Sequence, residues 1–253
     1  MEDKGNKLFV ILASIFLCNA LLAEFIGVKI FSLEQTLGFQ SLDHLSWWKL
    51  PSFNLTAGVL LWPVVFILTD IINEYYGQKG IRFLSYLTVV LIIFAFLVIN
   101  LAIYLNPADF WTSSGKYVQN MQLAYKAIFG QGAWIIAGSV IAFLIGQLLD
   151  VKVFHGIKLI TGEKKLWLRA TGSTLVSQLI DSFVVLFIAF YLSGTFTFTR
   201  VLEIGLVNYI YKFVVAIILT PLLYIIHNLI DNYLGKNIAA EMIAKAKQNK
   251  IML

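Results

Sequence analysis

The stretch LIGQLLDVKVFHGIKLITGEKKLWLRATGSTLVSQLIDS, residues 144–182, decides the fold of this chain. Its centre is rich in Lys and Arg, and an apolar run lies on each side of that centre. Each run holds the same polar pair, Gln147 with Asp150 and Gln178 with Asp181. Side chains three residues apart share a helix face, and an ionisable side chain inside a membrane helix usually has a function. The stretch therefore predicts a membrane hairpin with a basic loop and a buried polar site.

The composition places the whole chain in a membrane. Of its 253 residues, 59% are hydrophobic and 13% are charged, whereas a soluble domain is about half apolar and about a quarter charged. The net charge of +5 lies in short segments between apolar runs, which is typical of membrane proteins. The expected partner is therefore the lipid bilayer and not a nucleic acid.

Six segments reach the roughly 20 apolar residues that a helix needs to cross a bilayer. They are 8–31, 53–75, 81–105, 132–154, 171–192 and 202–229. Because these runs are long and lack a period of two, they do not fit the strands of a barrel. The sequence predicts an all-α fold: one membrane domain over 1–253, a polytopic helix bundle with six transmembrane helices.

The positions of Lys and Arg predict the orientation, because cytoplasmic loops carry an excess of both. The two termini, the turn near Lys79 and the central basic loop together hold 13 of these residues, against 4 on the other side. Both the N-terminus and the C-terminus are therefore expected in the cytoplasm. An external loop at 32–52 with Trp47 and Trp48, an outer amphipathic element at 106–131 and a basic inner tail at 231–253 complete the prediction.

Several polar side chains are expected inside the membrane. At a rise of about 1.5 Å per residue, Asp181 and Lys212 each fall near the middle of their spans. Asn19 falls near the middle of the first span, and Glu24 lies farther out. A charge at that depth needs a partner or a wet cavity, so Lys212 and Asp181 are predicted to pair with each other. A purely structural pair is the alternative.

The second span ends with a polar face near the cytoplasm. Asp70, Asn73 and Glu74 stand at positions i, i+3 and i+4 of one helix. Glu74 has the alternative reading of a residue that marks the interface. Pro63, like Pro221 in the last span, is expected to kink its helix.

The polar residues of the hairpin also have structural alternatives. Gln147 and Gln178 could simply join helices by hydrogen bonds. Asp150 could end its helix beside the basic loop and pair with Lys152.

The candidate set favours a neutral or cationic ligand with many N–H donors, because it is rich in carboxylates and carboxamides. The candidates for substrate binding are Gln178, Asp181, Gln147, Asp150, Asp70, Asn73, Asn19 and Glu24, and those for charge pairing or gating are Lys212 and Glu74. The chain contains no GxxxxGK[ST], HExxH or GxSxG motif. We therefore expect a protein that is not an enzyme, with no catalytic residues, no metal site and no cofactor.

Four motifs, in order, resemble the queuosine precursor transporter family, also called the vitamin uptake transporter family. They are FILTDIINEYYGQKGIR at 66–82, GQLLDVKVFHGIK at 146–158, LWLRATGSTLVSQLIDS at 166–182 and NYIYKFVVAIILTPLLY at 208–224. The first span, with NALLAEFIGVKIF at 19–31, fits as well. The resemblance implies a multi-pass protein of the bacterial inner membrane. It implies import of 7-deazaguanine precursors of queuosine for tRNA modification, either the 7-cyano or the 7-aminomethyl base.

The candidate residues suit such a base. A carboxylate accepts hydrogen bonds from its N1–H and amine, and a carboxamide can donate to O6. A flat ring also needs an apolar or aromatic slot, for which Phe183, Tyr209 and Tyr211 are candidates. A cationic aminomethyl group would favour a further carboxylate such as Asp70 or Glu24.

Two other functions remain open from the sequence alone. One is the substrate-binding subunit of an energy-coupling vitamin transporter. The other is an intramembrane enzyme that uses paired carboxylates such as Asp150 and Asp181. The choice of precursor, the energy source and the formation of a homo-oligomer are also left open.

Overall fold

Long helices dominate the computed structural model, which describes residues 2–39, 53–130, 132–162 and 165–248. The elements are α1 Glu2–Ile26, β1 Ile30–Ser32, α2 Leu33–Thr36, β2 Asn54–Thr56, the 3-10 helix η2 Ala57–Leu60, α3 Trp62–Tyr104, α4 Asp109–Thr112, α5 Met121–Phe129, α6 Ala133–Thr161, α7 Leu166–Leu186, the π-helix η3 Phe187–Tyr191, α8 Phe198–Leu234 and α9 Lys236–Gln248. In the described part of the chain, five stretches are long and apolar enough to cross a membrane: Lys4–Ile26, Trp62–Tyr104, Met121–Thr161, Leu166–Tyr191 and Phe198–Leu234. These helices agree with the expected all-α polytopic membrane protein.

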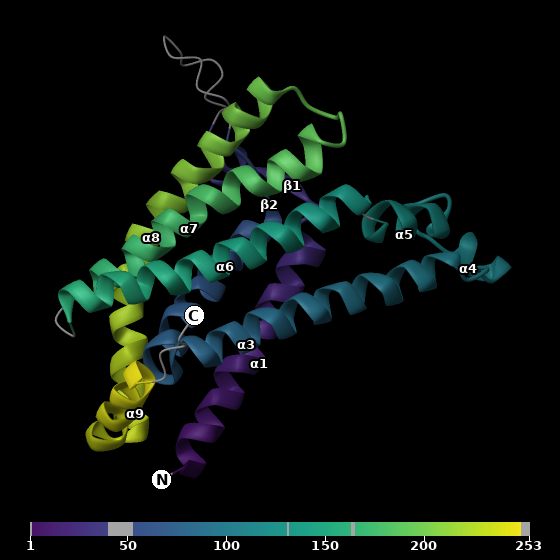
Figure 1. Ribbon diagram of the computed structural model, residues 1–253. Coiled ribbons are helices and arrows are strands. Elements are labelled where there is room, and N and C mark those ends of the chain that lie inside the picture. Colours follow the sequence, from purple (N-terminus) through teal and green to yellow (C-terminus); the bar gives the residue numbers. More distant parts are fainter. Residues whose placement is uncertain (1, 40–52, 131, 163–164, 249–253) are drawn as a thin grey trace.

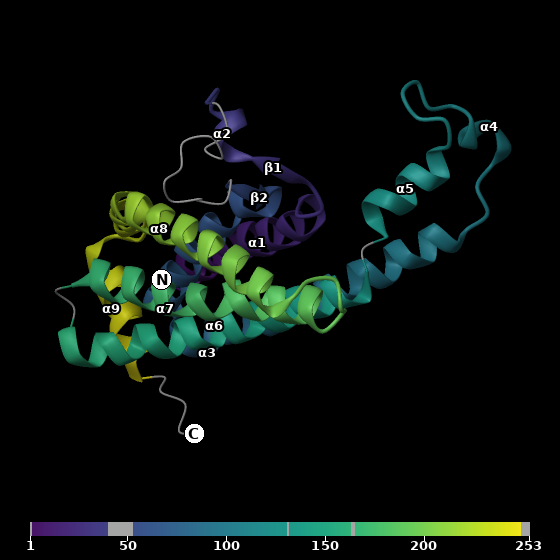
Figure 2. The same cartoon turned by 90° about the horizontal axis from the view of Figure 1, so that it is seen from above.

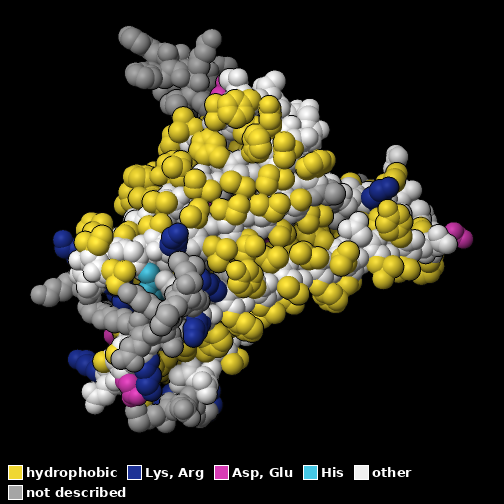
Figure 3. Space-filling model, viewed as in Figure 1, with side chains coloured by type: hydrophobic (Ala, Val, Ile, Leu, Met, Phe, Trp, Pro, Cys, Tyr) yellow, Lys and Arg dark blue, Asp and Glu magenta, His cyan; other side chains and the backbone are white. Residues whose placement is uncertain are grey.

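The bundle has one end rich in basic side chains. The N-terminal end of α1, the C-terminal end of α6 and α9 lie together at this end, and the β1–β2 ribbon, α4 and α5 lie away from it (Figures 1 and 2). Lys and Arg side chains gather there on the visible surface, whereas the sides of the bundle are covered with apolar side chains (Figure 3). An apolar belt between a basic end and an opposite end is the pattern of a protein oriented in a bilayer.

Helix α3 is bent sharply at Gly77, which has φ 74° and ψ −176°. The chain changes direction at this point, so α3 forms two arms, 62–76 and 78–104 (Figure 1). A positive φ is a region that glycine adopts without steric cost. Helix α9 packs against the bend so closely that a Cβ at position 77 would lie 2.9 Å from the carbonyl oxygen of Ala246. The tail expected on the inner surface is thus a helix docked on α3.

The basic segment at the centre of the chain is mostly helical and not a loop. Helix α6 continues to Thr161, ends at Gly162 with φ 61°, and α7 begins at Leu166. Lys158 and Arg169, which were expected in the loop, therefore lie within helices, and both are buried. The expectation was wrong because apolar residues between the basic ones allow the helices to continue.

The outer end of the first span also differs from the prediction. Helix α1 ends at Ile26 rather than at residue 31, and the next residues form the short antiparallel ribbon of β1 and β2. Phe31 pairs with Leu55 in this ribbon, and the Phe53 N–H donates to Oε1 of Glu34 over 2.7 Å. Strands of three residues are too short to leave a period in the sequence. Trp47 and Trp48 lie outside the described residues.

The two prolines behave differently. Pro63 lies in the first turn of α3, where a missing N–H costs nothing, so it starts a helix and does not kink one. Pro221 lies inside α8, which changes direction in its C-terminal half (Figures 1 and 2). Position in the helix thus decides the effect of each proline.

Candidate functional site

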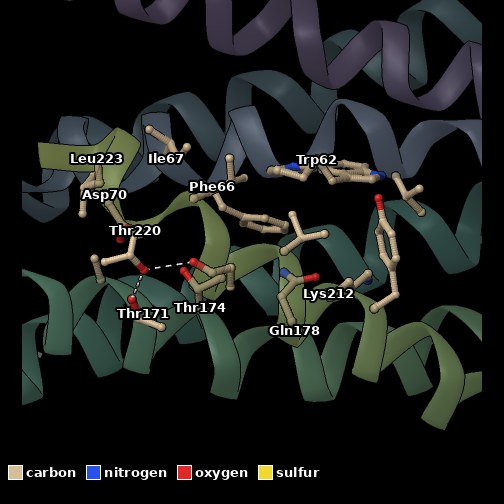
Figure 4. A pocket seen from close by; sticks show the side chains of 17 residues that line it. Trp62, Phe66, Ile67, Asp70, Thr171, Thr174, Gln178, Lys212, Thr220 and Leu223 are labelled. Carbon is tan, nitrogen blue, oxygen red and sulfur yellow. Dashed lines mark hydrogen bonds between the residues drawn. The ribbon is translucent and has the colours of Figure 1, made fainter. Parts of the chain in front are cut away.

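A cavity lies between the first arm of α3, α7 and α8, and encloses about 580 Å³ including the space at its mouth. We call it the pocket; its lining is mainly apolar with a few polar side chains (Figure 4). The lining residues are Val59, Trp62, Pro63, Phe66, Ile67, Asp70, Ala170, Thr171, Thr174, Gln178, Tyr211, Lys212, Val215, Ala216, Leu219, Thr220 and Leu223. Small-molecule sites have this balance of apolar and polar groups.

Three of the predicted site residues, Asp70, Gln178 and Lys212, line the pocket. Gln178 is 2% exposed, and neither its Nε2 nor its Oε1 has a hydrogen-bond partner among the described residues. Asp70 is 5% exposed, and its Oδ1 is also without a partner there. Buried polar atoms are normally satisfied, so these three atoms are available to a ligand in the pocket.

Aromatic side chains line the pocket near Gln178. Trp62 and Phe66 lie with ring centroids 6.2 Å apart and ring planes 26° apart (Figure 4). Tyr211 is the one expected aromatic residue that lines the pocket, whereas Phe183 packs under Gly205 and Tyr209 pairs with Phe213. Figure 4 shows Trp62 across the pocket from Gln178, so a flat ligand could contact both.

Sequence reasoning missed Trp62 and Phe66. Their spacing of four residues puts both on one helix face, and Pro63 marks the start of that helix. This signal was present in the sequence, but the span was expected to begin at residue 53. With that start, both rings fall in the middle of an expected membrane span.

The predicted pair of Lys212 and Asp181 is confirmed. The Nζ of Lys212 lies 2.6 Å from Oδ2 of Asp181, and the pair joins α8 to α7. The two side chains are 16% and 21% exposed. Lys212 lines the pocket, whereas Asp181, a predicted substrate-binding residue, does not.

Behind the pocket, Gln147 and Asp150 on α6 hold the neighbouring helices. Thr69 donates to Oε1 of Gln147 over 3.0 Å, and Ser177 donates to Oδ1 of Asp150 over 3.2 Å. Both predicted residues are buried, yet neither lines the pocket. Asp150 does not pair with Lys152, which is exposed, because side chains two positions apart point about 200° apart around a helix.

Asn73 lies next to this layer, one turn beyond Asp70 on α3. Its Oδ1 lies 2.8 Å from Nε2 of His155, while its Nδ2 has no partner among the described residues. The polar face predicted for the end of the second span therefore points inward. This face joins α3 to α6, and Asp70 is the one of its three residues that lines the pocket.

Glu74 is the centre of a buried ion cluster at the basic end of the bundle. One carboxylate oxygen lies 2.8 Å from Nζ of Lys158 on α6, and the other lies 2.7 Å from a guanidinium nitrogen of Arg169 on α7. Arg169 also donates to the carbonyl oxygen of Gly162 and lies over the ring of Phe154. The reading of Glu74 as an interface marker is wrong, because its side chain is 1% exposed.

The two candidates on α1 do not reach the pocket. Glu24 is buried and accepts a hydrogen bond from the Ser139 hydroxyl on α6. Asn19 donates to the carbonyl oxygen of Ile15 in its own helix over 2.8 Å. The Glu24 contact joins α1 to α6. The hydrogen bond of Asn19 lies within α1. No cluster of metal-ligand type occurs among the described residues.

A family model described as putative vitamin uptake transporter matches residues 56–244, which include every residue lining the pocket. The chain is similar to a probable queuosine precursor transporter from Bacillus subtilis, with 34% identity over 71% of this chain and 76% of that protein. It is similar to a queuosine precursor transporter from Escherichia coli, with 29% identity over 66% and 69% of the two chains. A probable queuosine precursor transporter from Haemophilus influenzae is 30% identical over 66% of each chain. No solved structure matches the chain.

Proposed function

Because the chain belongs to the family of putative vitamin uptake transporters, we propose that it imports a 7-deazaguanine precursor of queuosine across the bacterial inner membrane. The names of the relatives from Bacillus subtilis and Escherichia coli support this assignment. Those names describe transporters, which supports a carrier and not an intramembrane enzyme. The protein binds a small base on one side of the membrane and releases it unchanged on the other side.

The free carboxamide of Gln178 is the observation that carries the choice of substrate. A carboxamide both donates and accepts, so it can bind O6 and N1–H on the same edge of a guanine-like base. The unpartnered Oδ1 of Asp70 can accept from the exocyclic amine. Trp62 and Phe66 would contact the ring face, since aromatic rings stack on flat apolar surfaces.

The helices support six membrane crossings, with each arm of α3 counted as one. The second arm, 78–104, has 27 residues and reaches about 40 Å, while the first arm reaches about 22 Å and is preceded by η2. The gathering of Lys and Arg at the end with α1 and α9 supports cytoplasmic termini (Figure 3). Reporter fusions after Lys165 and after Lys116 should report opposite sides, and fusions that report the same side would contradict this topology.

The ion pair between Lys212 and Asp181 gives the ligand a way to change the protein's conformation. A base beside Gln178 would contact Lys212, which lines the pocket, and would compete with Asp181 for the Lys212 ammonium. The pair therefore favours the empty arrangement of α7 and α8, and the base favours another. A ligand changes a conformational equilibrium only through such a difference in interactions.

We expect the protein to act as a stand-alone carrier. The alternative, a binding subunit of an energy-coupling transporter, requires an ATPase module that co-purifies with the chain. Isolation of the tagged protein from a native membrane distinguishes the two. Recovery of a stoichiometric ATPase would replace the stand-alone carrier by the binding subunit.

The experiment that tests the transport function measures queuosine in tRNA. Cells that cannot make 7-deazaguanines and lack their own importer receive 7-cyano-7-deazaguanine at a limiting concentration, with or without this chain. We expect queuosine in tRNA only when the chain is present. Equal queuosine in both cultures would contradict the proposal. Cells that express Glu203→Gln, a change at an exposed pair with Arg200, serve as a matched control.

A further inference from the structure

The buried charges of α3, α6 and α7 do not balance. Among the described residues, these helices bury three carboxylates and two cations: Asp70, Glu74, Asp150, Lys158 and Arg169. Both cations bind the same carboxylate, because Lys158 and Arg169 each contact one oxygen of Glu74. Asp70 and Asp150 are left without a direct cationic partner in the described part of the chain.

The two remaining carboxylates are buried and incompletely hydrogen-bonded. Asp150 is 1% exposed; its Oδ1 accepts from Ser177, and its Oδ2 has no partner among the described residues. The Oδ1 of Asp70 likewise has no partner among the described residues. The hydrogen bonds of Thr69 with Gln147 and of Asn73 with His155 join α3 to α6 on either side of Asp70 and Asp150, so the two carboxylates lie at the same contact between these helices.

The surroundings supply too little positive charge for both carboxylates. The charged or titratable groups that face them are Glu74 on α3, His155 and Lys158 on α6, Arg169 on α7, and Tyr211 and Lys212 on α8. Lys158 and Arg169 are held by Glu74, and Lys212 is held by Asp181. An ionised carboxylate that is buried without a partner is costly, and two that interact avoid the cost by holding a proton. With one proton on the pair, the buried charges of α3, α6 and α7 sum to zero.

We propose that Asp70 and Asp150 hold one proton between them and that this proton crosses the membrane together with the base. The inference rests on the proposed import of 7-deazaguanines. Asp70 lines the pocket and Asp150 lies behind it, bound to Ser177 next to Gln178. When the N–H groups of a base donate to Asp70, that carboxylate must be ionised, so the proton moves to Asp150. Base and proton therefore occupy the site together.

The pair takes up and releases one proton in each transport cycle. On the outer side a carboxylate oxygen of the pair forms an O–H bond with a proton from water, and the base enters the pocket. On the inner side the base leaves, water enters the emptied pocket and solvates both carboxylates, and the O–H bond breaks to return the proton to cytoplasmic water. One proton enters with each base, so a pH gradient that is acidic outside drives accumulation.

Purified protein in liposomes with an entrapped pH dye tests this inference, and neutral 7-cyano-7-deazaguanine is the probe. We expect uptake of the base to acidify the lumen, and each unit of pH difference to increase accumulation about tenfold. A sodium gradient should have no effect. Accumulation by the wild-type protein without acidification, or driven by sodium, would overturn the inference while the proposed transport stands.

The variant Asp150→Asn separates coupling from transport, because its amide cannot carry the proton. We expect it to lose accumulation against a gradient but to keep the exchange of labelled for unlabelled base. Glu203→Gln, the same change of acid to amide at an exposed site, should keep both. Coupled accumulation by Asp150→Asn would overturn the inference. Failure of the wild-type protein to exchange the base at all would instead contradict the proposed function. If Asp150→Asn does not reach the membrane, the dye measurement on the wild-type protein decides alone.

Discussion

The pocket and the Glu74 ion cluster are two buried polar regions that share helices α3 and α7, yet they differ in how their polar atoms are satisfied. In the ion cluster, both oxygens of Glu74 have cationic partners within 2.8 Å. In the pocket, both polar atoms of the Gln178 carboxamide lack partners among the described residues. A satisfied cluster fixes the position of helices, whereas an unsatisfied one has capacity for a ligand. The difference assigns structure to the first region and binding to the second.

The largest loss of stability is expected when the charge of Glu74 is removed. Glu74→Gln leaves Lys158 and Arg169 buried without a counter-charge, and breaking a buried ion pair typically costs about 3–5 kcal/mol. We expect a large loss of thermal stability in detergent and low abundance in the membrane. Glu203→Gln, at an exposed pair, should melt like the wild-type protein. Equal melting of Glu74→Gln and wild type would contradict a structural role for the cluster.

The opposite result is expected at Asp70, in the pocket. Asp70→Asn removes a charged acceptor that has no cationic partner among the described residues, so the protein should remain stable and lose affinity for the base. A hydrogen bond to a charged group contributes about 1.5–3 kcal/mol, or roughly ten- to hundred-fold in affinity. Uptake of labelled base as a function of its concentration measures this change at equal protein abundance. Unchanged uptake by Asp70→Asn would move the ligand away from α3.

The bend at Gly77 links the ion cluster to α9. Gly77→Ala places a Cβ 2.9 Å from the carbonyl oxygen of Ala246 and puts a non-glycine residue at φ 74°. Such a conformation costs about 1–3 kcal/mol, so we expect α9 to separate from α3 and to become accessible to trypsin. Gly156→Ala, at an open position in α6, is the matched control. Equal protection of α9 in both variants would show that close packing at the bend does not hold it.

The smallest effect is expected at the ion pair of Lys212 and Asp181, which is partly exposed. A double-mutant cycle with Lys212→Met and Asp181→Asn should give a coupling of about 1 kcal/mol in thermal stability. The charge swap of Lys212→Asp with Asp181→Lys should restore abundance but not uptake, because a carboxylate would then line the pocket in place of the Lys212 ammonium. Additive single effects, without crosslinking of cysteines at the two positions, would contradict the pairing.

Local hydrophobicity predicted the long helices. The depth of each residue along its helix predicted the pairing of Lys212 with Asp181. The pairing could be predicted because depth in a membrane follows from counting residues along a helix, and two opposite charges at one depth need each other. Gln178 was a candidate because of its spacing from Asp181, and Asp70 because it shares a helix face with Asn73 and Glu74. These conclusions needed only the position of each residue along its own span.

The Glu74 ion cluster could not be predicted in this way. Lys158 and Arg169 lie in a basic segment, and the charge count that orients a membrane protein treats such residues as solvated. Their burial depends on where α6 and α7 continue past the apolar run and on how they turn toward α3. Such tertiary information is not contained in a local pattern. The aromatic wall of Trp62 and Phe66 was missed because the start of α3 depends on the preceding β2 and η2.

The measurement that most directly tests the central claim is equilibrium binding of 7-cyano-7-deazaguanine to the purified protein. Titration calorimetry on wild type, Gln178→Ala and Gln122→Ala compares the pocket with a control glutamine in α5, whose amide donates to the carbonyl oxygen of Ile103. We predict that wild type and Gln122→Ala bind alike, and that Gln178→Ala binds roughly ten- to hundred-fold more weakly with an unchanged melting temperature. Equal affinity of all three proteins for the base would contradict the assignment of the pocket as the binding site.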